Sequence, residues 1–177
     1  MPYPYKSVVN AIINKMRTGT ENIPRGENIS PLKLQKLLYY TCGYYLAASG
    51  GAPLIDHNFK AWEYGPVVPE LYRHFSHYGN RPIATLAHDY DPDSGAMVPV
   101  PPPPEGDPLF DTVLDFVVKT YGPYTALQLS EMTHADDSPW DKTRKANPGI
   151  RNADIDRGVL LNHFEQFVEQ RGAQAVG

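Results

Sequence analysis

Histidines at three-residue spacing are the side chains in this chain that most resemble part of a metal site. His74 and His77 share one face of an expected helix, and His88 follows soon after. A zinc site needs a third and a fourth ligand, and the sequence has no paired cysteines and no His-Glu-x-x-His motif to supply them. We therefore expect no metal and no cofactor, and we interpret these histidines as exposed residues at a helix end.

Cys42 and His134 are the remaining candidates for covalent or acid–base chemistry. Cys42 is the single cysteine and lies among tyrosines, where apolar surroundings raise a thiol pKa and make it unreactive. His134 is close in sequence to Asp136 and Asp137, a combination that can transfer protons, but no nucleophile accompanies it. We predict a core cysteine, a His134 whose hydrogen bond holds the turn beside Trp140, no catalytic residue and no enzymatic activity. A small metal- or histidine-dependent enzyme is the alternative.

An apolar segment in the first third of the chain must position these residues. Ser30 is a typical helix cap and Pro31 suits a first helical position, where a missing N–H costs nothing. The apolar and tyrosyl residues of the expected helix 31–48 are Leu32, Leu34, Leu37, Leu38, Tyr39, Tyr40, Cys42, Tyr44, Tyr45 and Leu46. A helix that is apolar on nearly every side must be enclosed by its own domain or by a partner. Within it, Gly43 indicates the close approach of another backbone or of an aromatic ring.

Apolar residues at helical spacing recur on both sides of this segment. We expect further helices at about 5–16, 69–75, 109–121, 125–132, 139–145 and 152–170. The fold class that follows is mainly α. We predict a single compact helical domain, residues 1–177 with a core of about 29–170, built around the central buried helix.

Residues 86–108 have a different character and are expected to form a proline-rich insertion or linker. Segments 83–85 and 97–100 are predicted to pair as a small β-hairpin around the polar turn 89–95. The four prolines at 101–104 favour an extended polyproline II spacer.

The formal net charge of −4 and the pI of about 5.8 provide no general attraction to nucleic acids or anionic membranes. Residues 1–50 nevertheless carry a net charge of +4, so a nucleic-acid-binding regulator that uses this first quarter is a second alternative. The single cysteine fits a reducing cytosol. Since no signal peptide and no apolar span of ~20 residues is evident, we expect a cytoplasmic protein with no membrane association.

Twelve tyrosines are an unusual supply of aromatic surface, and four of them belong to the central helix. Exposed aromatic rings stack nucleotide bases in single-strand binders, but that requires an adjacent basic groove. Residues 51–110 carry a net charge of −5, which argues against such a groove. Tyrosines at a protein–protein interface fit the composition better, because tyrosine is favoured where binding energy concentrates.

Several spaced motifs carry a resemblance to a known family. They are Leu34-Gln35-Lys36-Leu37-Leu38-Tyr39-Tyr40, then Trp62-Glu63-Tyr64-Gly65-Pro66-Val67-Val68 with Tyr72, then Leu129-Ser130, Thr133-His134 and Pro139-Trp140. With these motifs in this order, residues 29–167 closely resemble the Panacea domain, the antitoxin domain of SocA-like and GepA-like phage-associated proteins.

The resemblance implies a mostly helical antitoxin of a type II-like toxin–antitoxin system. Such a protein binds a cognate toxin, encoded by the adjacent gene, or in the SocA-like case delivers it to a protease. A homo-oligomer is left open. The 89–104 insertion is longer than the family minimum, and no helix-turn-helix extension for DNA binding is evident. The expected motif or partner-binding residues are Lys33, Lys36, Tyr39, Tyr44, Trp62, Tyr64, Gly65, Pro66, Tyr72, His134 and Trp140, with the two lysines as charged contacts.

Overall fold

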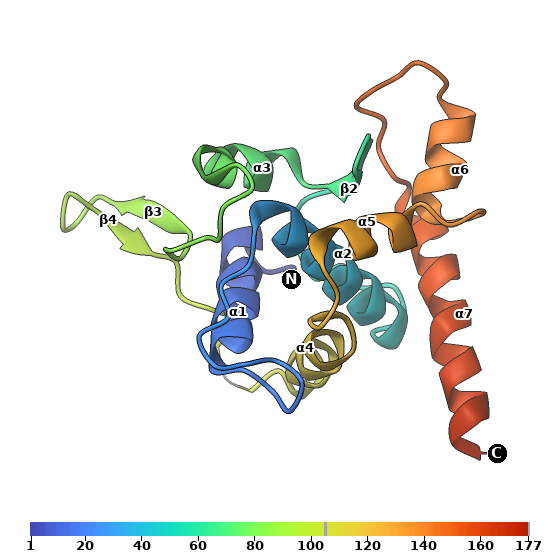
Figure 1. Ribbon diagram of the computed structural model, residues 1–177, viewed down its shortest axis with the longest axis horizontal. Coiled ribbons are helices and arrows are strands. Elements are labelled where there is room, and N and C mark those ends of the chain that lie inside the picture. Colours follow the sequence, from blue (N-terminus) through green and yellow to red (C-terminus); the bar gives the residue numbers. More distant parts are fainter. Residues whose placement is uncertain (105, 177) are drawn as a thin grey trace.

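The computed structural model describes residues 1–104 and 106–176, with side chains up to residue 172. Residue 105 of the expected insertion and residue 177 lie outside this part of the chain. Seven α-helices and two antiparallel hairpins follow one another within it (Figure 1), which confirms the mainly α prediction. The elements are α1 (Tyr5–Thr18), α2 (Pro31–Ala48), β1 (Lys60–Trp62), β2 (Gly65–Val67), α3 (Pro69–Phe75), a 3₁₀ turn (Ser76–Tyr78), β3 (His88–Asp91), β4 (Ala96–Pro99), α4 (Pro108–Tyr121), α5 (Ala126–Thr133), α6 (Pro139–Ala146) and α7 (Arg157–Val176).

The central helix α2 has the predicted bounds. The side chain of Ser30 accepts a hydrogen bond of 3.3 Å from the backbone N–H of Lys33, and Pro31 occupies the first turn. In Figure 1 α2 runs through the middle of the molecule, and it contacts α1, α3, α4, α5, α7 and strand β2. Since α2 has apolar residues on all sides, this enclosure is what its sequence requires.

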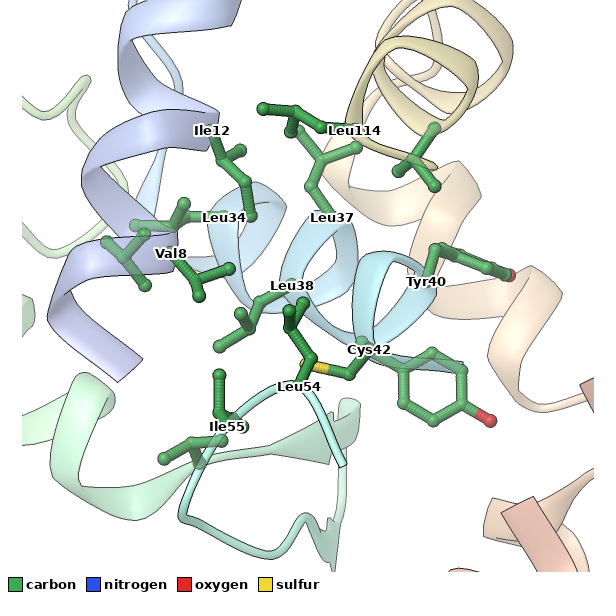
Figure 2. Packing of buried hydrophobic residues seen from close by; sticks show 14 of the residues in the cluster. Val8, Ile12, Leu34, Leu37, Leu38, Tyr40, Cys42, Leu54, Ile55 and Leu114 are labelled. Atoms are coloured by element: carbon green, nitrogen blue, oxygen red, sulfur yellow. The ribbon is translucent and has the colours of Figure 1, made fainter. Parts of the chain in front are cut away.

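The hydrophobic core is built where α1, α2 and α4 meet. Figure 2 shows Val8 and Ile12 of α1, together with Leu114 of α4, packed around Leu34 and Leu37 of α2. The two α2 leucines and the two α1 residues are fully buried. Burying one such side chain contributes about 1.5–3 kcal/mol, so this junction is a major source of stability.

Aromatic rings form the other side of the core, between α2, α4 and α7. The Tyr40 ring stacks on Tyr121 with centroids 4.0 Å apart, and the hydroxyls of Tyr121 and Tyr44 share a hydrogen bond of 2.6 Å. A Cβ atom on Gly43 would lie only 2.2 Å from the Phe164 ring. The predicted close approach to Gly43 is therefore real, and the approaching group is an aromatic ring.

The last helix begins later than predicted, at Arg157 instead of residue 152. The segment before it is held by backbone hydrogen bonds of 2.9 Å from Ala61 to Ala153 and from Ile155 to Phe59. These bonds occupy backbone groups that a helix would need. Asp156 then accepts a bond from the N–H of Val159 in the first turn of α7.

The first strand of the second hairpin was predicted wrongly at 83–85, since β3 is His88–Asp91 and pairs with β4. The carboxylate of Asp91 accepts hydrogen bonds from the backbone N–H and the hydroxyl of Ser94, which closes the turn directly after Asp91. Ile83 is instead buried, and its N–H donates to the carbonyl of Ile29 at 2.8 Å.

The contact at Gly43 predicts opposite effects for two glycine-to-alanine substitutions within helices. Alanine favours a helix by about 1 kcal/mol over glycine, but Gly43→Ala forces overlap with the Phe164 ring and should destabilise by about 2 kcal/mol or more. Gly172→Ala in α7 meets no atom within 4 Å and should be neutral or slightly stabilising. Urea unfolding of both variants measures the difference, and equal midpoints would contradict the packing of Phe164 against α2.

Candidate functional site

The sequence motifs converge beneath the β1–β2 hairpin, where three helices hold its backbone. Lys36 of α2 donates from Nζ to the carbonyl of Pro66 at 2.8 Å. Ser130 of α5 donates from its hydroxyl to the carbonyl of Tyr64 at 2.6 Å. Trp140 of α6 donates from Nε1 to the carbonyl of Trp62 at 2.6 Å. We call Lys36, Ser130 and Trp140 the hairpin clamp. It holds every second carbonyl from residue 62 to residue 66.

A fourth anchor lies at the end of the hairpin and was not foreseen from the sequence. The Gln35 side chain donates to the carbonyl of Val68 at 3.0 Å and accepts from its N–H at 2.9 Å. Gln35 is buried, and a buried amide must find partners of this kind. The signal available in the sequence was a polar residue, Gln35, within a helix that has apolar residues on nearly every side.

Lys36 is fully buried, so it cannot serve as the charged surface contact that we expected. Burial lowers its pKa from 10.5 to about 7, since no carboxylate offsets the loss of water. Lys33 is also tied down, because its Nζ donates to the carbonyl of Gly122 at 2.6 Å, and partial burial lowers its pKa. Lys36 therefore serves the fold, whereas the half-buried Lys33 stays a predicted charged contact.

Gly65 allows the hairpin to lie this close to the clamp. Its φ is +101°, and a Cβ atom there would sit 2.5 Å from Oγ1 of Thr133 and 2.9 Å from Nζ of Lys36. Any side chain at Gly65 would push the hairpin away from these groups. Glycine is therefore required for both its conformation and its size.

His134 lies beside Trp140 as expected, and the contact between the two side chains is a stack, while the backbone N–H of His134 donates to the carbonyl of Glu131 at 3.0 Å. The two rings are 3.9 Å apart and nearly parallel at 16°. Among the described residues, the buried Nε2 of His134 has no hydrogen-bond partner. Burial, and then the positive charges of Lys36 and Arg144, lower the pKa of His134, so a neutral ring is favoured.

The outer side of the hairpin presents aromatic side chains. The rings of Trp62 and Tyr72 of α3 meet edge to face with centroids 5.2 Å apart. Tyr72 is 49% exposed and Tyr64 is 61% exposed. Tyr39 and Tyr44, by contrast, are buried in the core and cannot reach a partner. We call Trp62, Tyr64 and Tyr72 the aromatic surface.

The residues considered for catalysis are dispersed. Cys42 is buried, and burial raises its thiol pKa. Nε2 of His74 accepts a hydrogen bond of 3.4 Å from the backbone N–H of His88, while His77 is exposed. Within the residues that the structure describes, no three His, Cys, Asp or Glu side chains are grouped to hold a metal ion.

None of the helices described combines the length and apolar character that crossing a bilayer requires.

The buried Lys36 predicts a pH dependence of stability. Since its folded pKa lies below that of the unfolded chain, the unfolded state binds more protons between pH 7 and pH 9, and stability due to Lys36 rises with pH. The gain is on the order of 2 kcal/mol over this range. Cys42 and the tyrosines affect the pH dependence of stability equally in both proteins. Lys36→Met should therefore lose only the gain that is due to Lys36. Identical pH profiles of urea unfolding in both proteins would contradict the burial of Lys36.

The close approach of Gly65 predicts a larger cost than at another glycine of positive φ. Gly95, in the β3–β4 turn, has φ +67° and no atom within 4 Å of the place a Cβ atom would take, so Gly95→Ala should cost about 1 kcal/mol from conformation alone. Gly65→Ala adds the overlap with Thr133 and Lys36 and should cost at least about 2 kcal/mol more. Thermal and urea unfolding compare the two, and similar losses would argue against the clamp geometry.

Comparison with known proteins gives a consistent picture. A family described as "Antitoxin SocA-like, Panacea domain" matches residues 34–141, which include the clamp and the aromatic surface. Antitoxin SocA of Caulobacter vibrioides is 38% identical over 136 residues, covering 77% of this chain and 68% of the relative. No solved structure matches the chain. The chain therefore belongs to the family of SocA-like antitoxins with a Panacea domain.

Proposed function

We propose that this protein neutralises a cognate protein toxin by binding it directly through the aromatic surface, as the antitoxin of a type II-like toxin–antitoxin system. The observation that carries the proposal is an exposed tyrosine, Tyr64, on a hairpin that three helices hold by its backbone. The family membership supplies the toxin as partner. The hairpin supplies a surface suited to binding it.

Rigid placement is the physical reason why this surface suits binding. Tyr64 and Tyr72 each offer an apolar ring with a polar hydroxyl, and such side chains commonly dominate interface energies. The clamp fixes the hairpin before a partner arrives, so less conformational entropy is lost on association. Trp62 adds to this rigidity, because its Nε1 donates to Oδ1 of Asn152 at 2.9 Å.

The proposed role is non-enzymatic and cytoplasmic, with the toxin encoded by the adjacent gene. Family membership supports binding over catalysis. The ring of His134, whose lowered pKa favours the neutral form, stacks on Trp140. Delivery of the bound toxin to a protease is an additional step compatible with the same surface. The negative net charge disfavours a nucleic-acid regulator, for which binding would fall steeply with salt.

Co-expression with the product of the adjacent gene tests the proposal. We expect wild-type protein to restore growth and to form a complex that survives size-exclusion chromatography. Tyr64→Ala and Tyr72→Ala should each raise Kd by about tenfold or more, because each removes an exposed ring at the binding surface. Tyr124→Ala, at a tyrosine that is 41% exposed before α5, is the matched control and should bind normally.

Two results would contradict the proposal. Failure of the wild-type protein to bind the adjacent gene product or to restore growth removes the antitoxin role. The second result is wild-type affinity in both Tyr64→Ala and Tyr72→Ala, with unchanged melting temperatures. The antitoxin role would then stand, but the aromatic surface would not be the toxin-binding site.

A further inference from the structure

The hairpin clamp encloses a basic side chain without a counter-charge. Lys36 is fully buried, and among the described residues its Nζ makes a single hydrogen bond, to the carbonyl of Pro66 at 2.8 Å, and no ion pair. An ammonium group has three hydrogens to donate, so a charged Lys36 would leave donors unpaired in a site that water does not reach. The closed clamp therefore favours the neutral amine.

A second basic group, the ring of His134, lies against the clamp. It stacks on the clamp residue Trp140 with ring centroids 3.9 Å apart. Its buried Nε2 has no hydrogen-bond partner among the described residues. A protonated ring carries an N–H at both nitrogens, and a buried N–H without an acceptor is costly. The closed clamp therefore favours a neutral His134 as well.

A third cation, Arg144 of α6, adds to the positive charge around the clamp. Its guanidinium lies 5.6 Å from the centre of the Trp140 ring and donates to the carbonyl of Ala61 at 3.3 Å. After burial, the charges of Lys36 and Arg144 are the main causes that lower the pKa of His134. Like charges gathered beneath one hairpin repel one another, so each further proton taken up there strains the closed form.

The carboxylates of the surrounding elements do not offset this charge. Glu131 of α5 acts on His134, but its effect is smaller than those of burial and the two cations, and its side chain is exposed. Glu63, in the turn of the hairpin, is exposed as well. Others are paired elsewhere, at 2.7–3.1 Å: Asp141 with Lys145, Asp154 with Lys60 and Glu70 with Arg73.

Lifting the β1–β2 hairpin off α2 would give both basic groups access to water. The carbonyls of Pro66 and Trp62 then leave Lys36 and Trp140, and the amine and the imidazole regain the proton affinity of exposed side chains. The open hairpin therefore holds more protons than the closed one, and by linkage acid favours opening. A local opening of this kind needs less free energy than unfolding of the whole chain.

We propose that the hairpin clamp is an acid-sensitive latch, in which Lys36 and His134 take up protons as the β1–β2 hairpin lifts, so that a fall in pH displaces part of the aromatic surface and weakens toxin binding. The hairpin is rigid while both groups are neutral. Trp62 and Tyr64 move with it, whereas Tyr72 stays on α3. The effect on the toxin rests on the proposed function, but the lifting is a property of the free chain.

Hydrogen exchange of the free full-length chain, followed by NMR at several pH values, tests the latch. The reporters are the backbone N–H of Val68 and the indole N–H of Trp140, which donate to Gln35 and to the carbonyl of Trp62 only when the hairpin is closed. After correction for the intrinsic pH dependence of exchange, their protection should fall about tenfold or more from about pH 9 to about pH 7, and again below about pH 6.5.

Three variants assign these two losses of protection. Lys36→Met should abolish the first one, because its side chain takes up no proton. His134→Phe keeps an aromatic ring against Trp140 and should abolish only the second. Lys33→Met is the matched control on the same helix and should keep both, since Nζ of Lys33 is bound to Gly122, away from the hairpin.

Protection that is independent of pH in the wild type, or that changes identically with pH in all of these proteins, overturns the latch. Equal protection of Val68 and of the buried α4 residue Val117 at every pH also overturns it, because the protons would then be taken up in global unfolding.

The effect on the toxin is measured with the purified adjacent gene product. Its Kd for the wild type should rise about threefold or more from about pH 8 to about pH 6, as the fraction of closed hairpin falls. The double variant Lys36→Met/His134→Phe should have the same Kd at both pH values. A wild-type Kd that does not change with pH overturns the coupling to the toxin. Absence of any complex removes the proposed function, while the exchange data still decide the latch.

Discussion

A helix that is apolar on every side imposes the main constraint on this protein. Because α2 has no face that can remain in water, the chain must enclose it with α1, α4, α5, α7 and the β1–β2 hairpin. Gln35 and Lys36 are polar exceptions on this helix, and both are used to hold the hairpin. The element that supplies the core therefore also positions the surface that we assign to toxin binding.

The hairpin clamp joins distant parts of the chain through backbone carbonyls. Lys36, Ser130 and Trp140 belong to three helices, yet they hold alternate residues of one short hairpin. Hydrogen bonds to backbone leave the side chains of the hairpin free to vary. The cost is a buried amine, whose charged form is disfavoured in the folded state.

Local sequence signals predicted what depends on neighbouring residues. Ser30 and Pro31 indicated the start of α2, and Gly43 indicated a close contact. The identity of distant partners, including Phe164 at Gly43, was missed. The segment before α7 is extended because it pairs with the backbone around Phe59 and Ala61, and Lys36 is buried because the hairpin folds over it. His134 was predicted beside Trp140, but the stacking of the two rings was not foreseen.

Hydrogen–deuterium exchange of the chain alone and with the adjacent gene product tests the central claim most directly. The claim is that a rigid hairpin held on α2 presents the toxin-binding surface. We expect added protection at residues 62–72, with the amides of α2 slow in both states. Protection confined to α1 or α7, or rapid exchange of the 62–68 hairpin in the free protein, would contradict the account.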